Sequence, residues 1–245
     1  MTDRTLLVTG AASGIGLAVA TRLAGPSTRL VLVDRDAGAL ARVDLPGTID
    51  HVEGDVADEA FWDALAPRLT GLTGAVVNAG VAGAGAIAGL AFAEWRRILS
   101  VNLDGAFLTL RAAMRAIEGP GAIVAVASAA GIKAESGIAA YASSKAGLIQ
   151  LVRVAAKEGA GRGLRVNAIA PAGVETPVWD AIPMFADRVA AIGRDAAFAE
   201  MAKAATPLGR YARAEEIAAQ VAFLLDDACG YVTGSVFVSD GGYTL

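Results

Sequence analysis

Short apolar runs rich in β-branched residues alternate along the chain with longer stretches rich in Ala and Leu. The short runs predict strands at Thr5–Thr9, Arg29–Asp34, Ile49–Glu53, Ala75–Asn78, Ala122–Ala127, Arg165–Ala170 and Ser235–Ser239. The intervening stretches predict helices, among them Gly16–Ala24, Glu59–Leu69, Trp95–Ile117, Tyr141–Glu158 and Glu215–Leu225. This alternation is typical of the α/β class, so we expect a doubly wound, seven-stranded parallel sheet with helices on both faces.

The pattern shows no linker, repeat or low-complexity segment, so we interpret residues 1–245 as a single domain. Right-handed crossovers place the carboxyl ends of all parallel strands at one edge of the sheet, where ligands of such folds bind. Residues 172–205 follow a predicted strand and carry Pro177, Trp179 and Met184 before an Ala-rich helical pattern. A long insertion at this edge predicts a substrate lid.

Composition and charge narrow the possible functions. Hydrophobic residues make up 55% of the chain and aromatic ones only 6%, which suits a buried parallel sheet under Ala-rich helices. The net charge of −4, with no basic stripe, argues against a nucleic-acid partner. One cysteine, Cys229, and one histidine, His51, exclude a disulfide framework and argue against a metal site. With no signal-like start and no long apolar run, we expect a soluble cytoplasmic protein that does not bind membranes.

A glycine-rich loop, Thr9-Gly10-Ala11-Ala12-Ser13-Gly14-Ile15-Gly16, joins the first predicted strand to the first helix. Glycine allows a tight turn and close backbone approach to a phosphate, and a helix N-terminus offers unpaired N–H groups. The spacing is G-x-x-x-G-x-G, which differs from the general dinucleotide fingerprint. The position between strand and helix favours a phosphate site over the alternative, a turn that glycine serves only through packing.

Asp34 ends the second predicted strand, where an acidic side chain can accept hydrogen bonds from a ribose 2′-OH and repel a 2′-phosphate. This position favours NAD over NADP as the cofactor. The neighbouring Arg35 could instead pair with a phosphate, cap a helix or face solvent.

Tyr141 and Lys145 lie four residues apart at the start of a predicted helix, so their side chains share a face. A lysine cation beside a tyrosine favours the phenolate, so we expect it to lower the tyrosine pKa from about 10. The pair could then exchange a proton with an alcohol or ketone oxygen. Ser128 ends the preceding strand, and its hydroxyl could hold that oxygen. Each feature alone is common on surfaces, but topology brings all three to the edge that carries the glycine loop.

Together these motifs resemble the short-chain dehydrogenase/reductase family over essentially the whole chain. Further matches are Asp55-Val56, Asn78-Ala79-Gly80, Val101-Asn102, the segment from Pro171 to Thr176, Tyr231-Val232-Thr233-Gly234 and Asp240-Gly241-Gly242. Several motifs in the same order are more specific than any one of them. The resemblance implies a Rossmann fold and direct hydride transfer between NAD and a secondary alcohol or ketone, without a metal.

The resemblance also implies a role for each matching residue. Tyr141 would be the general acid/base, Lys145 would lower its pKa and hold the nicotinamide ribose, and Ser128 would orient the substrate oxygen. Asn102 would maintain a proton-relaying water chain. The implied cofactor contacts are Gly10, Ser13, Gly14, Ile15, Gly16, Asp34, Asp55, Val56, Asn78, Ala79, Gly80, Tyr141, Lys145, Pro171, Val174 and Thr176.

Two further expectations come from the resemblance. Members usually have Pro-Gly after the sixth strand, whereas this chain has Pro171-Ala172-Gly173, which puts Ala172 and Gly173 in doubt as cofactor contacts. The family also implies a homotetramer in which the Tyr141 helix and the helix before it pack against a partner. Their alanine content suits close packing, although alanine is also simply a good helix former.

The residues indicate the substrate less specifically than they indicate the cofactor. Besides Ser128 and Tyr141, the residues expected near it are Ala130, Ile132, Ile138, Val174, Trp179, Pro183, Met184 and Phe185. Their apolar character indicates a hydrophobic substrate, cyclic or aromatic, unless these residues only pack the lid and the tetramer.

Three other functions are compatible with the fold but less so with the residues. A 3-oxoacyl-carrier-protein reductase would need a basic docking patch, and the segment from Ala116 to Gly121 has no basic cluster. A polyol or sugar dehydrogenase would want more polar pocket residues. A catalytically silent NAD-binding scaffold is disfavoured because Asn102, Ser128, Tyr141 and Lys145 are all present.

Overall fold

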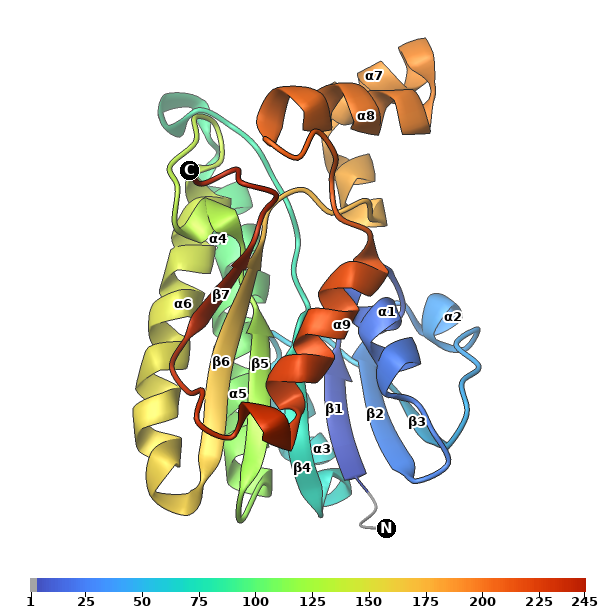
Figure 1. The fold of residues 1–245 in the computed structure, drawn as a ribbon, viewed down its shortest axis with the longest axis vertical. Coiled ribbons are helices and arrows are strands. Elements are labelled where there is room, and N and C mark those ends of the chain that lie inside the picture. Colours follow the sequence, from blue (N-terminus) through green and yellow to red (C-terminus); the bar gives the residue numbers. More distant parts are fainter. Residues whose placement is uncertain (1–3) are drawn as a thin grey trace.

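A computed structural model describes residues 4–245 of the chain, so the first three residues of the predicted domain lie outside it. Seven parallel strands form one sheet in the order β3-β2-β1-β4-β5-β6-β7 (Figure 1). Their bounds are β1 Arg4–Thr9, β2 Thr28–Asp34, β3 Thr48–Glu53, β4 Leu72–Val77, β5 Gly121–Val126, β6 Leu164–Pro171 and β7 Val236–Ser239. The predicted seven-stranded, doubly wound sheet is thus confirmed; the main boundary difference is β4, which begins three residues early and ends before Asn78.

Helices cover both faces of the sheet (Figure 1). One apolar cluster joins one sheet face to helices that include α1 and α9, and the other joins the opposite face to helices that include α3, α5 and α6. The strands supply Val and Leu to both clusters because successive side chains of a strand alternate between the faces. The helices are α1 Gly14–Leu23, α2 Ala37–Leu40, α3 Glu59–Leu65, α4 Phe92–Leu99, α5 Gly105–Ala116, α6 Ala139–Gly159, α7 Pro183–Ile192, α8 Arg194–Ala205 and α9 Ala214–Leu225.

The predicted helix Trp95–Ile117 has an internal irregularity. A π-helical segment, Ser100–Asp104, separates α4 from α5. Within it Asn102 is fully buried, and its amide pairs with both backbone groups of Val81 and with Ser144. Apolar periodicity did not reveal this, because π-helical turns depend on such tertiary partners rather than on the apolar pattern.

Residues 172–205 contain a 3₁₀ turn, Pro177–Ala181, followed by α7 and α8. These helices lie beyond the carboxyl edge of the sheet, at the top of Figure 1. They have their own small core in which Phe185, Phe198 and Tyr211 are buried and Trp179 packs against them. The segment thus has the position predicted for a lid; that it acts as one stays a prediction.

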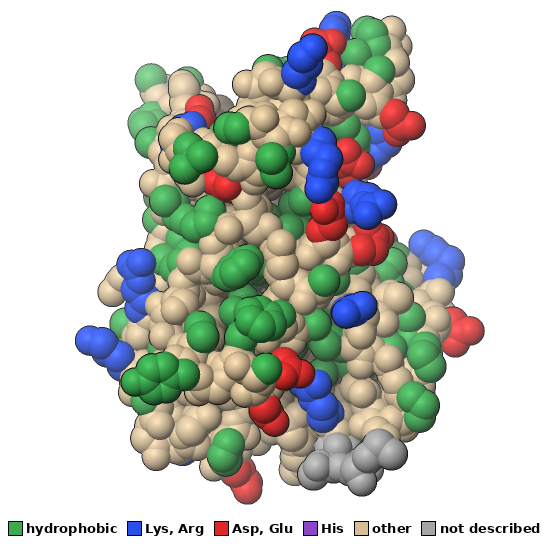
Figure 2. All heavy atoms as spheres, viewed as in Figure 1, with side chains coloured by type: hydrophobic (Ala, Val, Ile, Leu, Met, Phe, Trp, Pro, Cys, Tyr) green, Lys and Arg blue, Asp and Glu red, His purple; other side chains and the backbone are tan. Residues whose placement is uncertain are grey.

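Across residues 4–245, no helix combines the length and apolarity needed to cross a lipid bilayer. On the face shown in Figure 2, basic side chains are interspersed with acidic ones.

Candidate active site

A cleft with a volume of about 810 Å³ lies along the carboxyl ends of the strands. Its lining includes every expected cofactor contact except Gly16, and it runs from Asp34, the last residue of β2, to the residues of the lid. The strand ends therefore bring together residues that are far apart in the sequence, as the parallel topology predicts.

The glycine loop forms the floor of one half of the cleft. Gly10 and Gly14 have φ values of +64° and +54°, which side-chain-bearing residues rarely adopt. Gly16 is buried behind the loop, where a Cβ atom would lie 2.0 Å from the Gly10 carbonyl oxygen. Gly16 therefore shapes the loop without lining the cleft, which explains the glycine that the motif requires at this position.

The start of α1 is open to the cleft. Its N-cap, Ser13, makes no side-chain capping hydrogen bond with any described residue. The first N–H groups of a helix have no partner within the helix, so they are free to bind an anion. A pyrophosphate fits this position, and Ser13, Gly14 and Ile15 would hold it.

Asp34 closes this half of the cleft. Its carboxylate accepts hydrogen bonds from the backbone N–H groups of Ala12, at 2.9 Å, and of Asp36, at 3.0 Å. These contacts hold the carboxylate where an adenosine ribose would lie beside Asp55 and Val56. The neighbouring Arg35 is exposed but also lines the cleft. A nicotinamide dinucleotide therefore fits the chemistry of the lining residues.

The three proposed catalytic side chains meet at the middle of the cleft. Ser128 follows β5, and its hydroxyl donates to the Pro171 carbonyl at 3.4 Å and accepts from Ala130 N–H at 3.1 Å. Tyr141 and Lys145 are one turn apart on α6, with the ammonium nitrogen 5.8 Å from the tyrosine ring centre. The Lys145 ammonium donates to the Val126 carbonyl at 2.8 Å.

Burial controls the ionisation of this pair. It raises the pKa of Tyr141, although the nearby Ser128 hydroxyl opposes the shift. It lowers the pKa of Lys145 from 10.5 to about 8. In the protein alone, desolvation disfavours both charged forms, and the Lys145 ammonium is directed at a backbone carbonyl. That Lys145 lowers the pKa of Tyr141 in the loaded site stays a prediction.

Asn102 does not line the cleft. It lies behind the wall, where its amide fixes Val81, a lining residue, and Ser144 on α6. A Cβ atom on Gly80 would lie 3.3 Å from the Asn102 amide oxygen and 3.5 Å from the Lys145 nitrogen, so the three groups are close neighbours. This places Asn102 as a positioning residue; its role in a proton relay stays a prediction.

The displaced glycine after β6 has a clear packing reason. A Cβ atom on Gly173 would lie 2.2 Å from a ring carbon of Tyr211, because the tyrosine ring lies flat against the Gly173 backbone. The Ala212 N–H also bonds the Gly173 carbonyl at 3.0 Å. Both Ala172 and Gly173 line the cleft despite the altered motif.

The other half of the cleft is mainly apolar. The structure brings Ala130, Ile138, Val174, Trp179 and Met184 into its lining, as predicted. Two other residues do not line it: Phe185 is fully buried in the lid core, and Ile132 is half exposed outside the lining. The side chain of Pro183 lies outside the described atoms.

Sequence reasoning missed several lining residues, chiefly Met201, Thr206, Tyr211 and Tyr243. They come from α8, from the connection to α9 and from the C-terminal tail. No local motif marks them, because they reach the cleft only through the packing of the lid and the tail.

Comparisons with known proteins agree with this site. A family model described as enoyl-(acyl carrier protein) reductase matches residues 10–244. Cis-4-hydroxycyclohexanecarboxylate dehydrogenase of Sinomonas cyclohexanicum is 39% identical, with 99% of this chain and 97% of the relative covered. Galactitol 2-dehydrogenase (L-tagatose-forming) of Cereibacter sphaeroides is 36% identical, with 97% and 94% covered.

Among solved structures, levodione reductase superposes with a TM-score of 0.87 at 34% identity, and the match covers 98% of this chain and 97% of that one. The chain belongs to the short-chain dehydrogenase/reductase family. It is accordingly an oxidoreductase of alcohol and carbonyl groups that uses a nicotinamide cofactor.

Proposed function

We propose that the protein is an NAD-dependent dehydrogenase/reductase acting on a secondary alcohol or ketone of a hydrophobic ring. One observation carries this proposal: Ser128, Tyr141 and Lys145 meet in a cleft whose outer half is mainly apolar and aromatic. The named substrate of the Sinomonas relative, a hydroxycyclohexane acid, supports a ring.

The proposed chemistry divides among three side chains. Ser128 holds the substrate oxygen, Tyr141 exchanges a proton with it, and Lys145 passes that proton onward. The nicotinamide, when bound, takes up or gives the hydride. Because burial raises the pKa of Tyr141, its phenol is protonated at neutral pH and can donate to a ketone oxygen.

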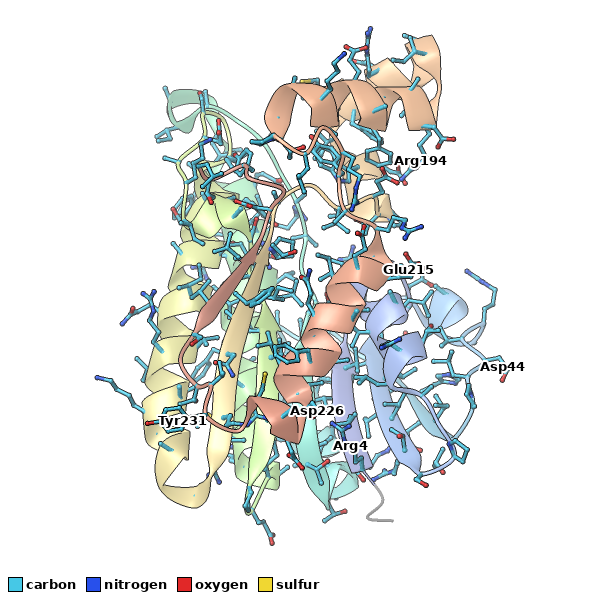
Figure 3. All side chains as sticks on the ribbon, in the orientation of Figure 1. Arg4, Asp44, Arg194, Glu215, Asp226 and Tyr231 are labelled. Atoms are coloured by element: carbon cyan, nitrogen blue, oxygen red, sulfur yellow. The ribbon has the colours of Figure 1, made fainter. Side chains whose placement is uncertain are left out.

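Asp34 supports NAD as the cofactor, because a carboxylate fixed by two backbone N–H groups would repel a 2′-phosphate. We expect Asp34→Asn to raise the NADP-to-NAD ratio of kcat/KM by about 10- to 100-fold, the usual range for a hydrogen bond to a charged group. Asp44→Asn is the matched control, since Asp44 is exposed outside the cleft (Figure 3). An unchanged ratio in Asp34→Asn would contradict the assignment.

The direct test follows reduced nicotinamide absorbance with cyclohexanol, other ring alcohols, galactitol and a 3-oxoacyl thioester, each with the NAD or NADP pair. Faster turnover of ring substrates with NAD supports the proposal. Preference for galactitol or the thioester would reassign the substrate class. NAD binding without any turnover would favour the silent scaffold.

We also propose a homotetramer that uses α5 and α6. Phe107 on α5 and Val154 on α6 are 46% and 43% exposed, so each helix offers a large apolar side chain that a partner would cover. Sedimentation analysis should give four chains for the wild type and fewer for Phe107→Glu. A monomeric wild type would overturn this proposal.

A further inference from the structure

Two tyrosines line the outer half of the cleft without any role in the proposed proton transfer. Tyr211 comes from the connection between α8 and α9, and Tyr243 comes from the tail after β7. Both are polar groups in a lining that is otherwise largely apolar there. A few converging polar groups in an apolar pocket usually fix a ligand's orientation.

Packing holds the Tyr211 ring in one position. The ring lies on Gly173 and stacks on Trp179 with ring centres 5.3 Å apart. It forms a T-shaped pair with Phe198, with ring centres 6.2 Å apart. Its hydroxyl has no hydrogen-bonding partner among residues 4–245, whereas its backbone carbonyl accepts a hydrogen bond from the Arg210 side chain at 3.1 Å. A phenol fixed in this way can donate a hydrogen bond to a ligand.

The tail holds Tyr243 just as firmly. Asp240 accepts hydrogen bonds from the N–H groups of Gly242 and Thr244 and from the Thr244 hydroxyl. Lys133 bonds the Tyr243 carbonyl at 2.7 Å and lies 4.5 Å over its ring centre. The backbone bond from Leu208 N–H to the Gly241 carbonyl, at 3.1 Å, joins this tail to the segment that leads to Tyr211.

The two phenols offer complementary hydrogen-bonding groups. Burial, the Glu135 carboxylate and the nearby Tyr211 raise the pKa of Tyr243 to about 12, and burial raises that of Tyr211. Both are therefore protonated at neutral pH. Glu135 lies close enough to Tyr243 to affect its pKa, and each protonated phenol can both donate and accept a hydrogen bond. A hydroxyl group satisfies both.

The charges around this half disfavour an anion. The lysine and arginine side chains that line the cleft are Lys145, at the proposed catalytic centre, and Arg35, beside Asp34. Lys133 does not line the cleft; its ammonium bonds the Tyr243 carbonyl from outside the lining. Glu135 adds a negative charge beside Tyr243. A carboxylate placed here would therefore have no lining cation of this half of the cleft to pair with.

We propose that Tyr211 and Tyr243 form a second hydroxyl-binding position, so that the substrate is an uncharged ring carrying another hydroxyl group across from the reacting carbon. This proposal rests on the proposed function, which supplies the reacting carbon and its position near Ser128 and Tyr141. It sharpens that function from a hydrophobic ring alcohol to a ring diol or hydroxyketone.

The test compares kcat/KM for NAD-dependent oxidation of 1,4-cyclohexanediol, cyclohexanol and cis-4-hydroxycyclohexanecarboxylate. The wild type should prefer the diol to both. Tyr211→Phe and Tyr243→Phe keep the rings, and each should lower the diol-to-cyclohexanol ratio about fivefold, the typical effect of one neutral hydrogen bond. Tyr231→Phe is the matched control, because Tyr231 is fully exposed well away from the lid (Figure 3).

Two results would overturn this inference while leaving the proposed function intact. One is wild-type oxidation of cyclohexanol or the carboxylate at least as efficient as that of the diol. The other is a diol preference that survives both tyrosine substitutions. If no ring alcohol is oxidised at all, the proposed function fails, and this inference fails with it.

Discussion

The two halves of the cleft are built in different ways. The cofactor half is made of backbone at the ends of β1, β2 and β4, where glycine loops and one fixed carboxylate leave little room for change. The substrate half is made of side chains from α7, α8, the connection before α9 and the tail. A small aromatic core packs the first three of these segments together. A fold can thus keep one binding half through backbone geometry while the other half varies through side-chain packing.

The largest effect is expected where the halves meet. Tyr141→Phe removes the proton-exchanging hydroxyl but keeps the ring, so kcat should fall about 1,000-fold, within the range for general acid/base catalysis. NAD affinity should change little, as measured by quenching of protein fluorescence. Unchanged oxidation of a good substrate would show that Tyr141 is not the acid/base.

Adding one methyl group to each half of the cleft should separate the effects on cofactor binding from those on substrate binding. In Gly16→Ala the new methyl would meet the Gly10 carbonyl oxygen at 2.0 Å, so the loop must distort and NAD affinity should fall by about 100-fold or more. In Gly173→Ala it would displace the Tyr211 ring, so KM for the alcohol should rise about tenfold with little effect on NAD affinity.

Gly119→Ala is the control for both changes, because a Cβ atom at Gly119 would have nothing within 4 Å. Titration with NAD and steady-state kinetics provide the two readouts. A similar loss of NAD affinity in Gly16→Ala and Gly173→Ala would show that the halves are not independent.

The pH dependence should report on Lys145. Its pKa of about 8 makes the amine neutral above that pH, where it can accept the proton that an alcohol releases through Tyr141. Oxidation should therefore rise about tenfold between pH 7 and 9, and ketone reduction should fall. In Lys145→Arg the cation stays protonated at every pH in this range. The variant should therefore be less active, and its oxidation rate should no longer rise between pH 7 and 9. An identical pH profile in this variant would contradict the assignment.

The smallest effect concerns the attachment of the lid. Arg194 pairs with Asp180, donates to the Thr176 carbonyl and lies over the rings of Phe185 and Phe198 (Figure 3). These groups are partly exposed, so Arg194→Ala should reduce stability by about 1 kcal/mol. Calorimetry should show a fall in Tm of about 2–4 °C, and the control Arg22→Ala, at an exposed position of α1, should show almost none. Equal Tm values would mean that Arg194 does not anchor the lid.

Several features could be predicted from residues alone. The alternation of strands and helices predicts the parallel sheet and its carboxyl edge. It also places the loop from Thr9 to Gly16 between a strand and a helix. Ser128 and Tyr141 could be assigned to one site because parallel strands end at one edge. The altered Pro171-Ala172-Gly173 motif could be noticed, but its reason lay in a ring 38 residues further along the chain.

Local patterns determine this protein's sheet, its glycine loop and the placing of Asp34, because strand periodicity and backbone conformation depend on neighbouring residues. Tertiary structure alone decided the ionisation of Tyr141 and Lys145, since burial outweighs their sequence spacing. It also brought Tyr211 and Tyr243 into the lining of one cleft. The lid connection and the tail are joined there by the backbone bond from Leu208 to Gly241, a long-range contact that no local pattern encodes.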